Sequence, residues 1–523
     1  MMQVGSTVDD ALRRRLIAEP ADLATCMDIV RGLSSSRSVY DWFRRVAALT
    51  AVPVDGDVMR KALAATKAIT GQELSRFANS GSIDTRLVVP FVVASMVVNN
   101  RIDWDRIAET PYPYERMGNN FERGMAMLSN QVVPGTARAI FEIMVVKQHI
   151  RALLLESGYL ALSDRMSESV SAFLRTMRLA MNGQDGPRGF TNQWTAAIGH
   201  MVLLAFMARG QQVPGLFDFK GVKVWEGPVA NGYLWRRIQA MAPEVERVEP
   251  GSVFADNHSS RNLEWIDGRY VDVFECCGIV ADRAGDERGA IMERPGPDDP
   301  ELRRFREAFG IDPEERIVTL HGRQAGYRQN DQHDMRNVDP QAYVPALRAL
   351  VARGYRVVRL GDPSMTPLPA IDGVVDYAVS PVKSEALDVL LPASAAFHIG
   401  SSSGLSVVPL LFGTPCLFLN WFPFDLLPWG RSNWTVLKPI VNLSDGTRVV
   451  DRRVYATAGQ LRTGPLLNAF GFEARTQTAE EIERSVVAFA EALEGETAAP
   501  PKTGANIGRI LVFDAAGQLR NLA

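Results

Sequence analysis

A run of three serines and a glycine, "SSSG" at residues 401–404, lies between two apolar segments of the sequence "FHIGSSSGLSVVPLLFGTPCLFLNW". This pattern predicts a strand that ends at the serines and a short helix that follows them. Gly404 would let the backbone approach a ligand closely, while the hydroxyls of Ser401, Ser402 and Ser403 and the amides of a helix N-terminus would bind a phosphate or diphosphate. The alternative is that the serines only cap the helix, because serine is a preferred N-cap residue.

Arginines gather in the segment "HGRQAGYRQNDQHDMRN", residues 321–337, which directly follows the strand-like sequence "RIVTL". The guanidinium fork matches phosphate oxygens with two hydrogen bonds, so arginines on a loop at a strand end indicate an anion site. We take Arg323 as the main candidate for binding a diphosphate. The other candidates in this segment for binding the same phosphorylated ligand are His321, Arg328, Arg336 and Asn337. A solvated polar loop is the alternative, because arginine is common on protein surfaces.

Two more polar residues lie near predicted element ends in the same half of the chain. Asp362, in "RLGDPSM", could accept hydrogen bonds from a ribose, or it could form a turn with Pro363. Lys383 lies at the start of a predicted helix and is a secondary candidate for the same anion site.

The candidate for proton transfer is His200, which follows Gly199 in "AAIGHMVLLAFMARG". The glycine predicts a turn between a strand and a helix. A second substrate that carries the attacking hydroxyl would bind on this side of the site. A histidine titrates near neutral pH and can accept a proton from an attacking hydroxyl. A histidine that only caps the helix is the alternative. For His398, close to the end of another predicted strand, we expect a structural role.

Motifs for metals and for common nucleotide cofactors are missing from the sequence. It contains no HExxH motif, no paired CxxC motifs, no Walker A motif and no GxGxxG fingerprint. The four cysteines, Cys26, Cys276, Cys277 and Cys416, have no metal-ligand spacing, and the adjacent pair cannot form an ordinary disulfide. We therefore expect a site without a metal or a cofactor, in a protein from a reducing compartment.

The 523 residues exceed the size at which one hydrophobic core stops growing, which predicts two or three domains. With 46% hydrophobic and 22% charged residues, a net charge of -3 and a pI near 6.2, the composition is typical of soluble globular proteins and not of nucleic-acid-binding proteins. The N-terminus lacks the apolar core of a signal peptide, and the longest apolar run, residues 87–98, is too short to span a membrane. We expect a cytoplasmic protein, a location that also permits peripheral association with the inner face of the membrane.

Hydrophobic periodicity changes along the chain and predicts four parts. Residues 1–182 show apolar residues at helical spacing, which predicts an all-helical domain. Residues 183–300 and 301–495 alternate strand-like and helix-like segments, which predicts two Rossmann-like α/β domains. Residues 282–300 are rich in charge, Gly and Pro and predict a linker, and residues 496–523 predict a C-terminal extension.

Turn and cap signals place the elements more closely. Asp339, Pro340 and Gly354 predict a helix between them, and Pro345 predicts that this helix starts late or is kinked. The predicted strands are residues 316–322, 355–361, 373–378, 395–400 and 415–421 in the second α/β domain and residues 220–227 in the first. The other predicted helices are residues 383–394, 405–413 and 478–495 in the second domain and residues 232–242 in the first, where residues 268–280 are read as strand or mixed.

Four stretches of the second α/β domain resemble a family of bacterial GT-B glycosyltransferases associated with surface-polysaccharide genes. They are "HGRQAGY", "RNVDPQAYVPALRALVARGYRVVRLGDPSM", "VVDYAVSPVKSEALDVLLPAS" and "HIGSSSGLSVVPLLFGTPCLFLNW". The resemblance covers about residues 185–470 and leaves the helical segment before them without a counterpart. It implies that the Rossmann-like domain of residues 183–300 lies on the acceptor side and that of residues 301–495 on the nucleotide-sugar donor side. The helical domain of residues 1–182 would then bind the acceptor or a partner.

Two motifs are similar to wider families. The His-x-Arg sequence at residues 321–323 is similar to a motif of the fucosyltransferase superfamily, in which the arginine contacts the donor diphosphate, and this implies that role for Arg323. The Gly-His turn is similar to that of the lipid-intermediate N-acetylglucosaminyltransferases, which implies that His200 is the base. The chain lacks the longer glycine run of the latter, and it has Gln324 where many fucosyltransferases have a second arginine.

These features predict a metal-independent GT-B glycosyltransferase that moves a sugar from a nucleotide-sugar donor to an acceptor. The acceptor would be a glycan, a lipid-linked sugar or a protein such as flagellin, and the two domains would close to exclude water. One alternative is a catalytically inactive protein that binds a sugar nucleotide or a glycan and acts through its helical domain. The other is a nucleotide-sugar epimerase. No motif identifies the donor sugar, the acceptor or the oligomeric state.

Overall fold

The computed structural model describes residues 185–250, 263–325, 334–424, 426–452, 472–495 and 508–522, together with isolated positions between 178 and 467. The chain divides into two compact units: the first contains residues 1–184, 249–257 and 261–263, and the second contains the remainder. The predicted helical domain lies outside the described residues apart from single positions. The short strand β4 (Ala255–Asp256) and the first residue of β5 belong to the first unit, and the other elements below belong to the second.

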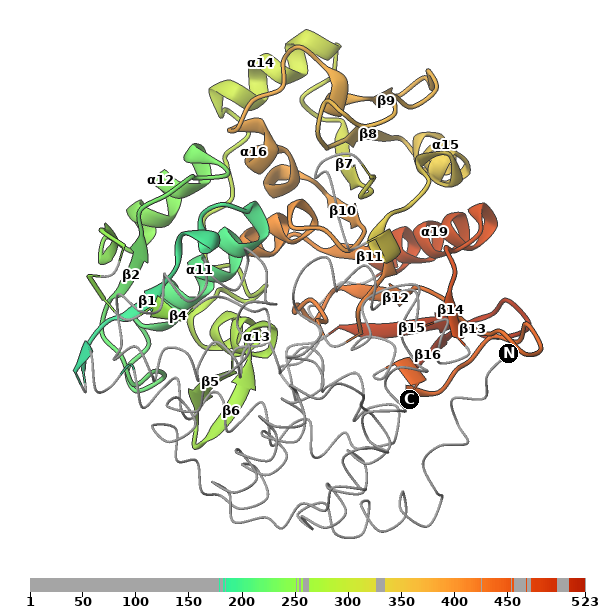
Figure 1. The fold of residues 1–523 in the computed structure, drawn as a ribbon. Coiled ribbons are helices and arrows are strands. Elements are labelled where there is room, and N and C mark those ends of the chain that lie inside the picture. The colour runs from blue at the N-terminus through green and yellow to red at the C-terminus, as the bar shows by residue number, and fades with distance from the viewer. Residues whose placement is uncertain are drawn as a thin grey trace, which may run out of the picture. The chain divides into compact units, whose positions relative to one another are not determined.

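The first half of the second unit, here the N-lobe, contains residues 185–248 and 264–284 and is built on three parallel strands in the order β3-β2-β1. Helices alternate with these strands, as predicted for the first α/β domain (Figure 1). Residues 268–280 form a strand followed by a helix. The elements, with η for 3-10 helices, are β1 (Arg188–Phe190), η3 (Asn192–Trp194), α11 (Ile198–Gly210), β2 (Val222–Trp225), α12 (Gly232–Met241), β3 (Val245–Val248), β5 (Leu263–Ile266), β6 (Arg269–Asp272) and α13 (Val273–Ala284).

Helix α11 is the central helix of the N-lobe. Residues 201–208, "MVLLAFMA", are all buried, so the helix presents no polar face along these two turns. The helix packs against α12 and α13 of its own lobe and against η7 of the C-lobe, which accounts for its apolar surface on all sides. Helices α12 and α13 begin at side-chain caps, Asn231 and Asp272, whose oxygens accept hydrogen bonds from amides of the first turn.

The second half of this unit, the C-lobe (residues 300–522), contains a sheet of eight strands in the order β16-β15-β12-β11-β10-β7-β8-β9. All neighbouring strands are parallel except β15 and β16. The elements are α14 (Pro300–Phe309), β7 (Arg316–His321), η4 (Asp334–Arg336), η5 (Pro340–Tyr343), α15 (Val344–Ala352), β8 (Tyr355–Arg359), β9 (Val374–Val375), η6 (Tyr377–Val379), α16 (Leu387–Ser394), β10 (Phe397–Gly400), η7 (Leu405–Phe412), β11 (Cys416–Trp421), β12 (Trp434–Leu437), β13 (Ile440–Asn442), β14 (Phe472–Ala474), α19 (Ala479–Gly495), β15 (Arg509–Phe513) and β16 (Leu519–Asn521).

The C-lobe sheet is doubly wound, as the sequence predicts. Strands β7, β8 and β9 run outwards in one direction, and β10, β11 and β12 run outwards in the other, so the order reverses between β7 and β10. Side chains of α15 and α19 form a core with one face of the sheet, and side chains of α14 and α16 form a second core with the other face. In sheets of this kind, ligands bind beyond the carboxyl ends of the strands at the reversal, which is called the switch point.

The predicted and observed helices differ at η7 and α16 and agree at α15. Residues 405–412 form the 3-10 helix η7 and not an α-helix, and Pro409 within it cannot donate a main-chain hydrogen bond. Asp339 caps η5, and α15 begins only at Val344 with Pro345 in its first turn, which confirms the predicted late start. Helix α16 begins at Leu387 and is shorter than the predicted residues 383–394.

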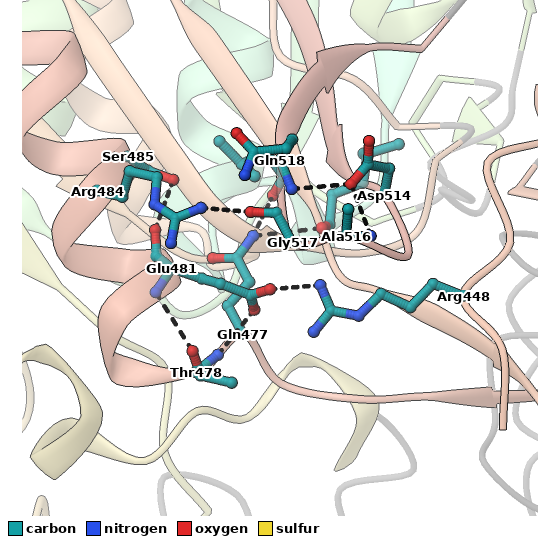
Figure 2. Close-up of polar contacts among 12 residues, drawn as sticks. Arg448, Gln477, Thr478, Glu481, Arg484, Ser485, Asp514, Ala516, Gly517 and Gln518 are labelled. Carbon is teal, nitrogen blue, oxygen red and sulfur yellow. Dashed lines mark hydrogen bonds and ion pairs between the residues drawn. The ribbon is translucent and has the colours of Figure 1, made fainter.

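Two segments that the sequence sets apart are packed into the C-lobe. In the predicted linker, Ile291 and Met292 are buried, and both amides donate to the Leu411 carbonyl oxygen at 3.0 and 2.9 Å. The predicted C-terminal extension contributes β15, parallel to β12, and the antiparallel edge strand β16. Figure 2 shows how α19 supports this end of the sheet: Thr478 and Glu481 form a reciprocal capping box at its start, and Arg484 donates to the Gly517 carbonyl oxygen in the β15–β16 turn.

Candidate functional site

The carboxyl ends of β7 and β10 meet at the switch point of the C-lobe sheet. His321, the last residue of β7, pairs with Gly400, the last residue of β10. The Ser401 amide continues this pairing by donating to the His321 carbonyl oxygen at 3.0 Å. The arginine-bearing segment and the "SSSG" turn therefore leave the sheet side by side, as the alternation of strands and helices predicts.

Ser401 and Ser402 fix the two loops beside this turn. Ser401 Oγ accepts a hydrogen bond from the Arg323 amide at 2.8 Å, and Ser402 Oγ accepts one from the Phe422 amide at 2.7 Å. Both serines are buried. Neither caps η7, whose N-cap is Gly404 without a side-chain hydrogen bond. The capping alternative is therefore wrong, and the two buried hydroxyls hold main-chain amides in place.

His321 is neutral and holds Ser403. His321 Nδ1 lies 3.2 Å from the Leu360 carbonyl oxygen, which can only accept a hydrogen bond, so Nδ1 carries the proton. His321 Nε2 then accepts a hydrogen bond from the Ser403 hydroxyl at 3.0 Å. Burial is the main reason that the pKa of His321 falls to about 4, and the positive charges of Arg359 and Arg323 act in the same direction. His321 therefore positions Ser403 and adds no positive charge at neutral pH.

The Arg323 backbone is fixed on both sides. Its amide donates to Ser401, and its carbonyl oxygen accepts a hydrogen bond from the Val338 amide at 2.9 Å. These bonds hold Arg323 two residues after β7, with a half-buried side chain. The predicted diphosphate-binding arginine thus lies directly beside the predicted anion-binding turn.

Gln324, which stands where many fucosyltransferases have an arginine, has a structural role here. Its Oε1 atom accepts hydrogen bonds from the Thr366 amide at 2.9 Å and from Arg359 Nη2 at 3.3 Å. Arg359 is 2% exposed and forms an ion pair with Asp376, with Nη1 to Oδ1 at 2.9 Å. A second arginine at position 324 would bring a like charge against Arg359, so the neutral amide suits this neighbourhood.

Lys438 holds the segment that carries Arg336 and Asn337. The lysine is buried, and its Nζ donates to the carbonyl oxygens of Met335 at 2.6 Å and Asn337 at 3.2 Å. Arg336 and Asn337 are half-buried. Sequence reasoning missed Lys438, although a lysine directly after the apolar strand "WTVL" is a signal that could have identified it. Arg328 lies outside the described residues.

Asp362 and Lys383 make local contacts. Asp362 Oδ1 accepts a hydrogen bond from the Ser364 amide at 2.9 Å, which is the turn-forming role that the sequence left open. Lys383 Nζ lies 2.6 Å from Asp388 Oδ2 and 5.2 Å from the centre of the Tyr377 ring. Lys383 is still close enough to His321 to help lower the pKa of that histidine.

Two glycines bring the N-lobe into main-chain contact with the "SSSG" turn. A Cβ atom on Gly199, in the first turn of α11, would lie 2.6 Å from Gly404 Cα. A Cβ atom on Gly404 would lie 2.7 Å from the Gly199 nitrogen. The acceptor-side and donor-side turns that the sequence predicts separately are therefore in direct contact.

His200 follows Gly199 and is half-buried. Its Nδ1 lies 2.9 Å from the Gln193 carbonyl oxygen, so Nδ1 donates and carries the proton of the neutral ring. Nε2 is then the basic nitrogen, which is the tautomer that general-base catalysis through Nε2 requires. The bond to Gln193, outside the helix, differs from the helix cap that the sequence left as the alternative.

A second contact between the lobes involves Glu385, which sequence reasoning missed because nothing distinguishes it within the predicted helix of residues 383–394. Asn231 Nδ2 donates to the Glu385 carbonyl oxygen, and the Gly232 amide donates to Glu385 Oε2, both at 2.9 Å. The carboxylate therefore lies at the N-terminus of α12, where the helix dipole favours negative charge. Together with Gly199 and Gly404, this contact fixes the register of the two lobes.

His398 is fully buried in β10 and stabilises the sheet beneath the turn. Its Nδ1 lies 2.9 Å from Thr319 Oγ1 on the adjacent strand β7, and burial lowers its pKa to about 3. This agrees with the structural role predicted for it. Elsewhere in the described part of the chain, no cluster of three His, Cys, Asp or Glu side chains is arranged to hold a metal ion. No helix among these residues is long and apolar enough to cross a membrane.

The chain matches no protein-family model and no curated protein sequence. It overlaps in part with solved bacterial glycosyltransferases. The dodecameric iron-containing heptosyltransferase TibC of enterotoxigenic E. coli, in complex with ADP-D-beta-D-heptose, is 13% identical, with 59% of this chain and 78% of that chain covered at a TM-score of 0.33. E. coli ADP-heptose LPS heptosyltransferase II is 12% identical, with 59% of this chain and 98% of that chain covered at a TM-score of 0.32. A family 9 glycosyl transferase of Veillonella parvula is 15% identical, with 44% of this chain and 65% of that chain covered at a TM-score of 0.24. TM-scores this low do not decide between folds, so the function has to be inferred from this chain's own residues.

Proposed function

We propose that the protein is a glycosyltransferase that binds a nucleotide sugar at the switch point of the C-lobe and transfers its sugar to an acceptor bound by the N-lobe. The observation that carries this proposal is the contact between Gly199 and Gly404. This contact supports the proposal because His200, the next residue after Gly199, would be the base and the turn of Gly404 lies beside Arg323. A base and an anion site on opposite lobes, meeting at one strand edge, are the parts that group transfer from a phosphorylated donor needs.

On the donor side, the diphosphate would be bound by Arg323 and by main-chain amides of the turn. Among the hydrogen bonds between described residues, none has the amide of Ser403 or Gly404 as its donor. These amides precede η7 and suit an anion. Charge that develops on the leaving diphosphate would be stabilised by Arg323, with Arg336 as a secondary candidate. Positive charge from arginine would allow a mechanism without a metal ion.

Ser403 would contact the sugar and not the phosphate. Its hydroxyl donates to His321 Nε2, so the oxygen can accept but cannot donate a further hydrogen bond. A sugar hydroxyl is a donor that matches this acceptor, whereas a phosphate oxygen is not.

In the reaction, the bond between the sugar's anomeric carbon and the diphosphate breaks while a bond to the acceptor oxygen forms. The acceptor proton would pass to His200 Nε2, and the nucleoside diphosphate would leave. The bond from Nδ1 to the Gln193 carbonyl oxygen orients the ring and fixes the tautomer in which Nε2 can accept a proton. The acceptor would be a glycan, a lipid-linked sugar or a protein such as flagellin, recruited by residues 1–182, with the reaction in the cytoplasm or at the inner face of the membrane.

The test is a thermal-shift screen with ADP-, UDP-, GDP-, CMP- and dTDP-sugars. A ligand at a hundred times its Kd stabilises the folded state by about 2.7 kcal/mol, so one class should raise the melting temperature. The Arg323→Ala variant should lose that shift. No shift with any donor would refute the donor site. Binding without release of a nucleoside diphosphate would favour the inactive binding protein, and an isomerised sugar nucleotide in the absence of an acceptor would favour the epimerase.

A further inference from the structure

We infer that the main-chain contact between Gly199 and Gly404 positions His200 for proton transfer, and that the two glycines are required because only they permit this approach. The inference rests on the proposed function and adds to it a positioning role for Gly199, which does not itself touch the reacting atoms, and a second role for Gly404 besides the proposed binding of the diphosphate by its amide. Glu385, which bonds the N-terminus of α12, supports the same register between the lobes.

The backbone conformation of Gly404 does not require glycine. Its φ and ψ of -62° and -36° lie in the right-handed helical region, which every residue can adopt. Gly199 lies in the first turn of α11, where alanine would favour the helix more than glycine does. Neither glycine is therefore explained by its own chain segment.

The space around the two glycines explains them. A Cβ atom at Gly199 would meet Gly404 Cα at 2.6 Å, and one at Gly404 would meet Gly199 Cα at 3.0 Å and the Ile198 Cγ2 atom at 3.5 Å. The closest of these contacts are to backbone atoms, which cannot turn aside as a flexible side chain can. By contrast, a Cβ atom at Gly296 or Gly495 would have no heavy atom within 4 Å.

A methyl group at position 199 would therefore act on the register between the lobes. The 2.6 Å approach must open by about 0.8 Å to reach 3.4 Å, the lower limit of ordinary van der Waals contact. His200 is the next residue, so it moves with this turn relative to Arg323 and the donor. A misplacement of about 1 Å costs on the order of a hundredfold in rate when reacting groups must be aligned.

The experiment uses the full chain and the nucleotide sugar that stabilises the wild type, with water as the acceptor and release of the nucleoside diphosphate as the readout. We expect Gly199→Ala, at donor concentrations that saturate it, to release product about 10- to 100-fold more slowly than the wild type. Gly296→Ala is the matched control, because its methyl group meets open space, and it should release product at the wild-type rate.

A double-variant cycle separates positioning from general damage. If Gly199 acts through His200, the combined variant Gly199→Ala/His200→Ala should be no slower than His200→Ala alone. Additive losses, or a wild-type rate for Gly199→Ala, would overturn the inference. If Gly199→Ala does not fold, Glu385→Ala tests the same register from an exposed position, and it should slow product release without an added effect in the His200→Ala background. A wild-type rate for Glu385→Ala would then overturn the inference. Failure of the proposed function looks different, because the wild type itself would neither bind a donor nor release product.

Discussion

Replacement of Ser401 by alanine tests whether a buried hydroxyl places Arg323 for donor binding. The substitution removes the hydroxyl oxygen of a residue with no exposed surface. This oxygen accepts a hydrogen bond from the Arg323 amide at 2.8 Å. Loss of one partner of a buried hydrogen bond costs about 1–3 kcal/mol of the free energy of unfolding. Because the released amide belongs to Arg323, we also expect the Arg323 side chain to shift relative to the donor. Donor affinity should fall about tenfold, which corresponds to about 1.4 kcal/mol of binding free energy.

The control for this prediction is Ser485→Ala. Ser485 is equally buried, and its hydroxyl donates to the Glu481 carbonyl oxygen at 2.8 Å within α19 (Figure 2). Thermal unfolding and calorimetric titration of the donor would be measured for both variants. Both should lose stability, but only Ser401→Ala should lose donor affinity. Equal donor affinity in the two variants would refute the argument that Ser401 orients Arg323.

Two further predictions concern charge at the switch point. Gln324→Arg should lower the free energy of unfolding by about 1–3 kcal/mol. The substitution removes an oxygen that accepts hydrogen bonds from Arg359 and the Thr366 amide, and it brings a second positive charge beside Arg359. An unchanged melting temperature would contradict the role given to Gln324. The pKa of His321 is about 4 in the folded protein, below the 6.5 of an ordinary histidine, so its contribution to stability is complete above pH 6.5 and is lost as the pH falls towards 4. The loss should approach about 3 kcal/mol and should shrink in His321→Gln, with His398 contributing in the same direction; melting temperatures that stay constant across this window would contradict the assignment.

The C-lobe can be predicted closely from the sequence because its strands are short apolar runs separated by helices with clear caps. The run "RIVTLH" forms β7, and the cap signals of Asp339 and Gly354 correctly bound the helical segment that follows this strand. The neighbouring positions of Arg323 and Ser401 follow from this alternation, because parallel strands end at one edge. Residues 509–513 are harder to identify as a strand of the sheet, since they follow a Pro- and Gly-rich segment that is typical of a linker.

The contacts within the site cannot be predicted in this way, because they join residues distant in the chain. Nothing in the sequence near Gly199 indicates that it meets Gly404, and the carboxylate of Glu385 gives no sign that it caps α12. The sequence suggests that the serines donate to a ligand, whereas Ser401 and Ser402 accept from main-chain amides. Such roles depend on tertiary packing and not on local sequence.

The most direct test of the central claim is the release of a nucleoside diphosphate from the nucleotide sugar that stabilises the wild type. The wild type should release it, and Arg323→Ala should do so about 100- to 1000-fold more slowly, as expected when one group that stabilises the leaving charge is removed. Arg304→Ala, which changes an arginine side chain on α14 that is 73% exposed, should match the wild type. Equal rates for Arg323→Ala and Arg304→Ala would contradict the claim that Arg323 binds the donor diphosphate.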